Sequence, residues 1–129
     1  MEAKICIDTD FLANLLRGRK DEIDFIKSQE TKAELSTTYV NLFELYYWAF
    51  KSMERENNLA AISALLPKLN LLNFSDEAAK KAGEVLAKLE REGKPIDFRD
   101  LFIGAIALTS GYSIKTKNLK HFNRIEGNF

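Results

Sequence analysis

Apolar and polar positions divide the chain into short strand-like segments and longer segments of helical spacing. Four short segments between turn residues are predicted as strands, at residues 3–8, 34–37, 69–73 and 112–115. Residues 124–126 are a candidate for a fifth strand. Because these strands are short and lack a polar alternation, we expect both faces of their sheet to be covered.

The segments between the strands repeat apolar residues at intervals of three and four and are predicted as helices. Ser75 and Asp97 precede two of them as N-caps, and Gly93 and Gly111 follow the same two as stop signals. In chain order, the predicted helices cover residues 11–16, 21–28, 39–56 with a continuation to 66, 76–92, 98–110 and 118–122.

Strands that alternate with helices predict a parallel sheet with helices on both faces, which is an α/β fold. A chain of 129 residues has room for one such core, so residues 1–129 are predicted to form a single domain. No repeat, linker or low-complexity segment divides the sequence.

Composition narrows the class of protein without indicating a function. The chain is 46% hydrophobic and 29% charged, and its 19 basic and 19 acidic residues balance, which excludes a disordered chain. No apolar run reaches the roughly 18 residues that cross a bilayer, and the first run is too short for an export signal. The single cysteine, Cys6, is expected to be a buried thiol in a reducing cytoplasm.

Asp8 directly follows the first predicted strand. Parallel sheets bind ligands at the carboxyl ends of their strands, so this position suits a functional acid. The alternative is an N-cap for the next helix, a role for which Asp10 competes.

Glu44 lies in a helix with little other polarity. Between residues 39 and 50, tyrosine and tryptophan aside, Asn41 and Glu44 are the only polar residues. A carboxylate among apolar neighbours is costly unless it is paired or hydrogen-bonded, which favours a functional acid. The alternatives are an acid that reaches solvent at the helix edge and a salt bridge to Lys51.

Asp100 opens a helix whose body, residues 101–108, is apolar on all sides and therefore predicted to be central. The positive end of the helix dipole stabilises a carboxylate at this place. If Asp100 is considered alone, a purely structural role is equally good: Asp97 would cap the helix, and Asp100 would only interact with the helix dipole.

Taken together, the three acids suggest a metal site. Carboxylates that converge at one sheet edge repel one another, and their pKa values rise unless a cation neutralises them. Oxygen ligands without histidine or cysteine suit Mg²⁺ or Mn²⁺, which can activate water for attack on a phosphodiester. This inference assumes that Asp8, Glu44 and Asp100 meet in space.

Four segments in order carry a resemblance to a known family. Residues 5–12 (ICIDTDFL), 36–45 (STTYVNLFEL), 95–107 (PIDFRDLFIGAIA) and 116–122 (TKNLKHF) resemble the successive blocks of PIN-domain ribonucleases, and most of all VapC-type toxins. The resemblance implies a PIN-like three-layer α/β/α sandwich. Its central sheet would be short and mainly parallel, with four to five strands.

The resemblance also implies the active-site residues. Asp8, Glu44 and Asp100 would be catalytic and bind Mg²⁺ or Mn²⁺, and the fourth acidic position falls on Asn118. Asparagine carries no charge, so we expect weaker metal binding or a single ion without loss of activity. Supporting positions are expected at Thr9, Thr116 and Asp97.

The same resemblance implies the partners: a structured RNA substrate, a neutralising antitoxin protein and a second copy of the chain in a homodimer. No association with a membrane is expected. Phosphate contacts are assigned to the basic residues near the C-terminus, although a solvated surface explains them nearly as well. His121 is expected to be a surface or packing residue. The basic residues are Lys115, Lys117, Lys120 and Arg124.

Other readings remain open at this point. Asp8-Thr9-Asp10 after a strand also looks like the nucleophile motif of a haloacid-dehalogenase-type phosphatase, but no late acidic pair accompanies it. A weakened PIN fold that only binds RNA or protein is a second alternative, and Asn118 is its best argument. The aromatic residues Tyr46, Tyr47, Trp48 and Phe50 are expected in the core or in a dimer interface. The prediction that we carry forward is a metal-dependent endoribonuclease, the toxin of a VapBC-type pair.

Overall fold

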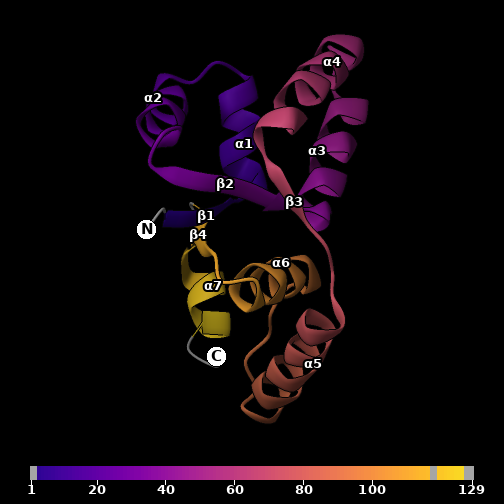
Figure 1. Cartoon of the computed structure of the whole chain (residues 1–129). Coiled ribbons are helices and arrows are strands. Elements are labelled where there is room, and N and C mark those ends of the chain that lie inside the picture. Colours follow the sequence, from indigo (N-terminus) through magenta and orange to yellow (C-terminus); the bar gives the residue numbers. More distant parts are fainter. Residues whose placement is uncertain (1–2, 117–118, 127–129) are drawn as a thin grey trace.

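A parallel four-stranded sheet lies at the centre of the computed structural model, with strand order β3-β2-β1-β4 (Figure 1). The structure describes residues 3–116 and 119–126, with backbone alone for 119–121 and 126. Cys6 on β1 pairs with Ser36 on β2 and with Ile114 on β4, so β1 lies between these two strands. The strands are β1 (Ala3–Ile7), β2 (Ala33–Thr38), β3 (Asn70–Leu72) and β4 (Ser113–Lys115).

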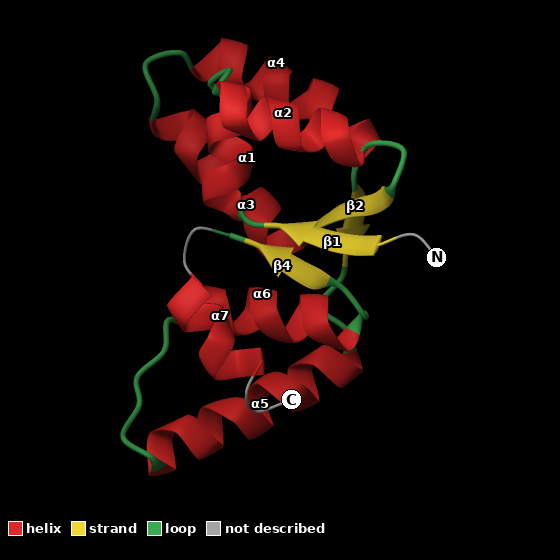
Figure 2. Ribbon diagram, turned by 90° about the vertical axis from the view of Figure 1, so that its left-hand side faces the viewer, coloured by secondary structure: helices red, strands yellow, loops and turns green. Residues whose placement is uncertain are grey.

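Helices α1 to α4 cover one face of the sheet, as Figure 2 shows. Their core contains Leu12, Leu45 and Ile62, none of which is exposed to solvent. A short 3₁₀ turn, Leu66–Lys68, joins α4 to β3. The helices are α1 (Thr9–Leu16), α2 (Lys20–Gln29), α3 (Tyr39–Lys51) and α4 (Arg55–Leu65).

Helices α5 to α7 cover the other face (Figures 1 and 2). Helix α6 lies next to the sheet, and its residues Leu101, Ile103 and Ala105 form a second core with α5 and α7. The bounds are α5 (Asp76–Arg91), α6 (Phe98–Thr109) and α7 (Leu119–Glu126). The three layers confirm the predicted α/β/α sandwich, and the sheet has four strands in the described part of the chain.

The predicted caps are present. Ser75 Oγ accepts a hydrogen bond from the backbone of Ala78 at 3.1 Å and begins α5. Asp97 Oδ1 accepts one from the backbone of Arg99 at 2.8 Å and begins α6. Gly93 and Gly111 follow these helices with φ of 69° and 83°, the left-handed backbone that glycine adopts without strain.

The prediction of one helix over residues 39–56 is wrong. Helix α3 ends at Lys51, because Ser52 adopts an extended backbone with ψ of 160°, and α4 starts anew at Arg55. Ser52 Oγ donates to the Ala49 carbonyl at 2.7 Å and accepts from Asn58 Nδ2 at 2.9 Å. These bonds stabilise the break by giving backbone and side-chain groups new partners.

The candidate fifth strand is also wrong, since residues 124–126 belong to α7. Phe122 and Ile125 lie three positions apart on one helical face and are buried against α6. The close approach depends on Gly104, where an added Cβ would lie 2.6 Å from Ile125 Cδ1. A segment of eight residues was too short for its helical period to be separated from a strand pattern.

In the described residues, no helix has the length and apolar character needed to cross a bilayer.

Candidate active site

Asp8 follows β1 at the place where the sheet order changes direction, with β2 on one side and β4 on the other. Ligands of open α/β sheets bind at such a point. The residue is 5% exposed and occupies the N-cap position of α1, but its side chain makes no capping hydrogen bond. Instead, Oδ1 accepts from Asn41 Nδ2 at 3.1 Å and Oδ2 from Thr116 Oγ1 at 2.7 Å. The carboxylate is thus held by residues from two other parts of the fold.

The environment of Asp8 favours its protonated form. Burial raises the pKa of this carboxyl above its ordinary value, because a buried charge loses its hydration. Hydrogen bonds from Thr116 and from the backbone of Thr9 oppose the rise, and the negative charges of Asp10 and Asp100 add to it. Asp8 and Asp100 therefore lie close enough to repel each other.

Asn41 is the centre of the network, and no role was predicted for it from the sequence. Its side chain is fully buried, and its Oδ1 accepts from the backbone and the hydroxyl of Thr38 at 3.1 and 2.8 Å. Its Nδ2 donates to Asp8 Oδ1 and to Thr9 Oγ1, the latter at 3.0 Å. The spacing Thr38-x-x-Asn41 is that of a capping box, which was the available signal.

Glu44 joins this network through Thr9. The Thr9 hydroxyl donates to Glu44 Oε1 at 2.8 Å while it accepts from Asn41. Burial raises the pKa of Glu44, and the charges of Asp8 and Asp100 raise it further, against the hydrogen bond of Thr9 and the positive charge of Arg99. Thr9 and Thr116, which were predicted as supporting positions, donate hydrogen bonds to Glu44 and Asp8 respectively.

The start of α6 supplies the third acid. Asp97 caps the helix, and Asp100 stands in its first turn, half-buried. Burial alone would raise the pKa of Asp97, but hydrogen bonds from the backbone and side chain of Arg99 hold it below its usual value. Arg99 also approaches Glu44, with 3.6 Å between the guanidinium and Oε2. The salt bridge considered for Glu44 is therefore made with Arg99, while Lys51 lies over the ring of Tyr47, 4.8 Å from its centre.

The basic residues near the C-terminus have differing surroundings. The Lys115 ammonium lies 4.7 Å from the ring centre of Phe25, and the guanidinium of Arg124 donates to the carbonyl of Pro95, which leads into α6. Lys117 and Asn118 lie outside the described residues, as do the side chains of Lys120 and His121.

The acids are neighbours without forming a closed metal site. Within residues 3–116 and 119–126, no three histidine, cysteine, aspartate or glutamate side chains stand together as a ready ligand group. Their chemistry nevertheless fits Mg²⁺ or Mn²⁺, because carboxylate oxygens are the ligands that these hard ions prefer. The negative charges of Asp8 and Asp100, which add to the rise in the pKa of Glu44, would also attract a cation to this place.

The comparisons with known proteins agree with this architecture. A model of the PIN domain matches residues 5–128. The chain belongs to the PIN-domain family. This PIN domain is 30% identical over 122 residues to Ribonuclease VapC2 of Haemophilus influenzae, which covers 95% of this chain and 92% of that protein. It is also 30% identical to the tRNA(fMet)-specific endonuclease VapC of Salmonella typhimurium over 124 residues; this alignment covers 96% of this chain and 93% of that protein.

A solved structure supports the same relationship. The DNA-bound VapBC of Salmonella typhimurium matches this PIN domain with a TM-score of 0.86 at 28% identity, over 97% of this chain and 94% of that one. The predicted resemblance to PIN-domain ribonucleases and VapC toxins is confirmed. The family assignment removes the basis for the phosphatase alternative.

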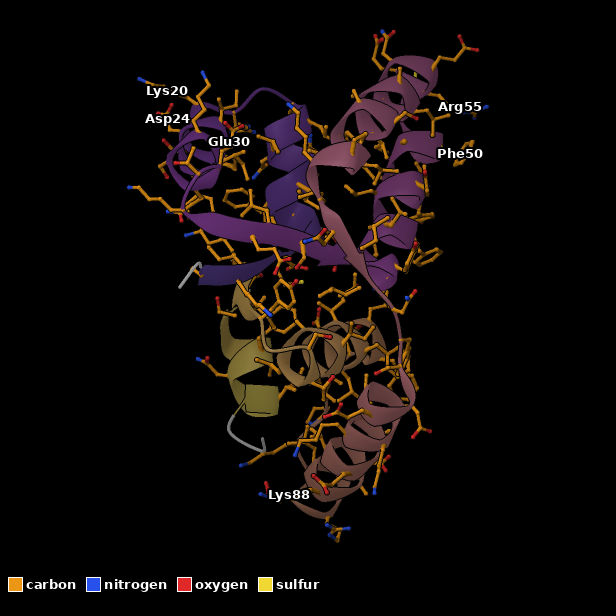
Figure 3. The ribbon with its side chains drawn as sticks, viewed as in Figure 1. Lys20, Asp24, Glu30, Phe50, Arg55 and Lys88 are labelled. Atoms are coloured by element: carbon orange, nitrogen blue, oxygen red, sulfur yellow. The ribbon has the colours of Figure 1, made fainter. Side chains whose placement is uncertain are left out.

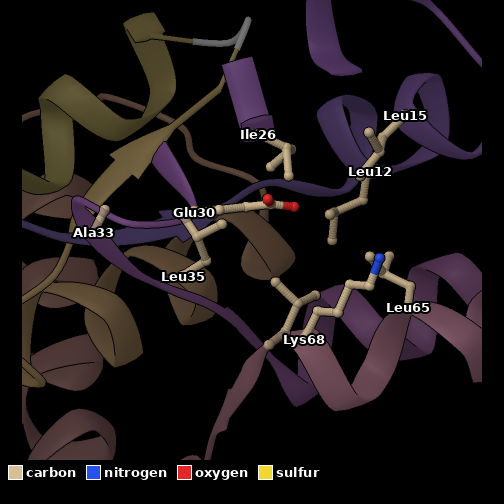
Figure 4. A pocket seen from close by; sticks show the side chains of 9 residues that line it. Leu12, Leu15, Ile26, Glu30, Ala33, Leu35, Leu65 and Lys68 are labelled. Carbon is tan, nitrogen blue, oxygen red and sulfur yellow. The ribbon is translucent and has the colours of Figure 1, made fainter. Parts of the chain in front are cut away.

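An apolar pocket of about 260 Å³ lies apart from these acids, between α1, α2, β2 and the end of α4 (Figure 4). Leu12, Leu35 and Leu65 form its walls, and Glu30 and Lys68 bring opposite charges to it. Neither Asp8, Glu44 nor Asp100 lines it. The pocket is therefore a separate feature of the surface.

Proposed function

We propose that this PIN domain is a Mg²⁺- or Mn²⁺-dependent endoribonuclease that cuts structured RNA, and that it is the toxin of a VapBC-type pair. The observation that carries the proposal is the buried Asp8 carboxylate, which is hydrogen-bonded to Asn41 and Thr116 and electrostatically coupled to Asp100. Relatives named as ribonucleases and as a tRNA(fMet)-specific endonuclease support the choice of RNA as substrate.

Asp8, Glu44 and Asp100 are the residues that would hold the divalent ion, with Asn118 as a neutral fourth position. When bound, the ion supplies positive charge that orients and activates a water for attack on the phosphodiester and stabilises the leaving oxygen. Asn41 and Thr116 fix the direction of the two Asp8 oxygens, and Thr9 fixes one oxygen of Glu44. These fixed carboxylate orientations are the chain's own contribution, because the side chains then need to move less when metal and substrate bind.

RNA would approach over the C-terminal basic residues. Lys115 ends β4, the strand that pairs with β1, and the other three basic residues come after it in the sequence: Lys117, Lys120 and Arg124. Each phosphate contact would make binding more sensitive to salt. The bond of Arg124 to the Pro95 carbonyl gives this residue a second use, because it ties α7 to the segment that leads into α6.

The partners that we propose are a second copy of the chain and an antitoxin, in the cytoplasm. Tyr39, Phe43, Tyr47 and Phe50 are each about half exposed and recur along one side of α3, a stripe suited to a dimer interface. Figure 3 shows Phe50 projecting outward near Arg55. The apolar pocket between α1, α2 and α4 offers an antitoxin segment a separate place to bind.

The proposal is tested by cleavage of RNA with purified protein freed of partners. A panel of tRNAs, initiator tRNA included, is incubated with Mg²⁺, with Mn²⁺ or with EDTA. We expect cleavage only with the metals, and none after Asp8→Asn or Asp100→Asn. Cleavage of equal extent in EDTA by a contaminant-free preparation would exclude the mechanism.

The alternative function is a PIN domain that binds RNA or protein without cleaving RNA, and the uncharged Asn118 is the observation that favours it. A module would hold RNA equally well with and without EDTA, and Asp100→Asn would leave its affinity unchanged. The same preparations measured by filter binding therefore separate the two functions.

A further inference from the structure

Arg99 is a cation in an unexpected position. It lies in the first turn of α6, where the helix dipole disfavours positive charge. Two carboxylates offset that cost: Arg99 lies 3.5 Å from Asp97 Oδ1 and 3.6 Å from Glu44 Oε2. The side chain is 54% exposed, so it reaches Glu44 from the solvent side.

Both oxygens of Glu44 are engaged as a result. Oε1 accepts from Thr9, whose hydroxyl is in turn fixed by the buried Asn41. Oε2 faces the half-exposed guanidinium of Arg99, and both partners of this ion pair are accessible to water. Because exposed ion pairs are weak, Oε2 is the oxygen that can exchange its partner at low cost.

We propose that Arg99 is an internal counter-ion that competes with the divalent metal for Oε2 of Glu44 and thereby lowers the metal affinity of the site. This inference rests on the proposed metal-dependent function. In the metal-free chain the guanidinium neutralises Glu44. When an ion binds, Arg99 must release that oxygen, and its positive charge also repels the ion from close by. Arg99 is therefore a positioning residue for Glu44.

The test is a Mn²⁺ titration of the full chain, followed by the electron paramagnetic resonance signal of free Mn²⁺ and without RNA. Wild type is compared with Arg99→Gln, with the charge-preserving Arg99→Lys, and with Arg55→Gln as a control. Arg55 lies at the start of α4, 6.0 Å from the ring centre of Phe50, and losing it changes the net charge equally (Figure 3).

We expect Arg99→Gln to bind Mn²⁺ about two- to fivefold more tightly than wild type, and the other two variants to stay within about twofold of it. In a Glu44→Gln background, the gain in Mn²⁺ affinity from Arg99→Gln should fall by at least about half, because the carboxylate for which Arg99 and the metal compete is absent. A merely structural role of Arg99 would give no gain in affinity and no such coupling.

Three results would overturn the inference: unchanged or weaker Mn²⁺ binding by Arg99→Gln, an equal gain in Arg55→Gln, or a gain that is undiminished in the Glu44→Gln background. In each of these cases Mn²⁺ still binds, and the proposed function stands. If wild type and all variants bind no Mn²⁺, the metal-dependent function fails together with the inference.

Discussion

The side-chain amide of Asn41 donates to Asp8 Oδ1 across 3.1 Å and so connects α3 to the residue that follows β1. The same amide donates to Thr9, which holds Glu44. One buried and fully hydrogen-bonded residue therefore sets the relative position of two candidate ligands. Its loss should affect both stability and activity.

Asn41→Ala is expected to lower the free energy of unfolding by about 2 kcal/mol, because the buried polar groups of Thr38 and Asp8 lose a partner. Urea denaturation measures this loss. The control is Asn57→Ala on the exposed side of α4, which should change stability by less than about 0.5 kcal/mol. If the two substitutions lower the free energy of unfolding equally, the hydrogen bonds of Asn41 do not stabilise the fold more than those of an exposed asparagine.

The free energy of unfolding should depend on pH through the titration of Asp8. Burial raises its pKa in the folded chain above the ordinary value of 3.8, so folding takes up protons at pH values between the unfolded and the folded pKa. The stabilising contribution is therefore complete below the unfolded pKa and is lost as pH rises through the folded pKa. Asp8→Asn removes this loss, so in EDTA the unfolding free energy of the variant relative to wild type should increase as pH rises above the ordinary carboxyl pKa. A difference independent of pH would contradict the raised pKa.

Divalent metal should stabilise the folded chain. At a free Mn²⁺ concentration ten times the dissociation constant, the gain is about 1.4 kcal/mol, which raises the melting temperature of a chain of this size by about 5 °C. Asp8→Asn and Asp100→Asn should show a much smaller rise, because each removes a charged ligand. Calorimetry with Mn²⁺ and with EDTA measures the shift, and an equal shift in all three proteins would place the ion elsewhere.

The contact between α6 and α7 makes Gly104 intolerant of a side chain. Gly104→Ala is expected to cost about 1–2 kcal/mol, since its Cβ would meet Ile125 Cδ1 at 2.6 Å, and adding Ile125→Val should recover part of that cost. Gly83→Ala is the matched control: its Cβ would meet nothing within 4 Å in α5, so it should stabilise the chain by about 0.5–1 kcal/mol. Denaturant unfolding distinguishes the opposite signs.

The aromatic stripe of α3 predicts the oligomeric state. Phe43→Glu or Phe50→Glu places a charge in the proposed interface and should convert a dimer into monomers, as measured by light scattering after size exclusion. Ala79→Glu, on an exposed position of α5, should leave the mass unchanged. A wild-type monomer at high concentration would refute the homodimer, and a dimer that survives both charged variants would place its interface elsewhere.

Local patterns were sufficient for most of the architecture. The caps at Ser75 and Asp97 and the first strand, which ends just before Asp8, were predicted correctly to within one residue because each depends on neighbours in the chain. The single helix over residues 39–56 and the strand at 124–126 were wrong. The two errors have different causes. The break at Ser52 depends on the directions of the Ser52 and Asn58 side chains, which a hydrophobic period does not show, and α7 is stabilised by packing against α6, which a short window of sequence does not contain.

The sequence by itself determined the type of fold and the candidate acids, since hydrophobic period, capping residues and rare carboxylates in apolar surroundings are properties of the local chain. Tertiary structure alone decided how these acids are held. Asn41 and Asp8 are 33 positions apart, and the pairing of Arg99 with Glu44 requires α6 to lie beside α3. Such contacts arise only when the sheet brings the ends of distant segments together, because the direction of a side chain and the depth of its burial depend on the packed whole.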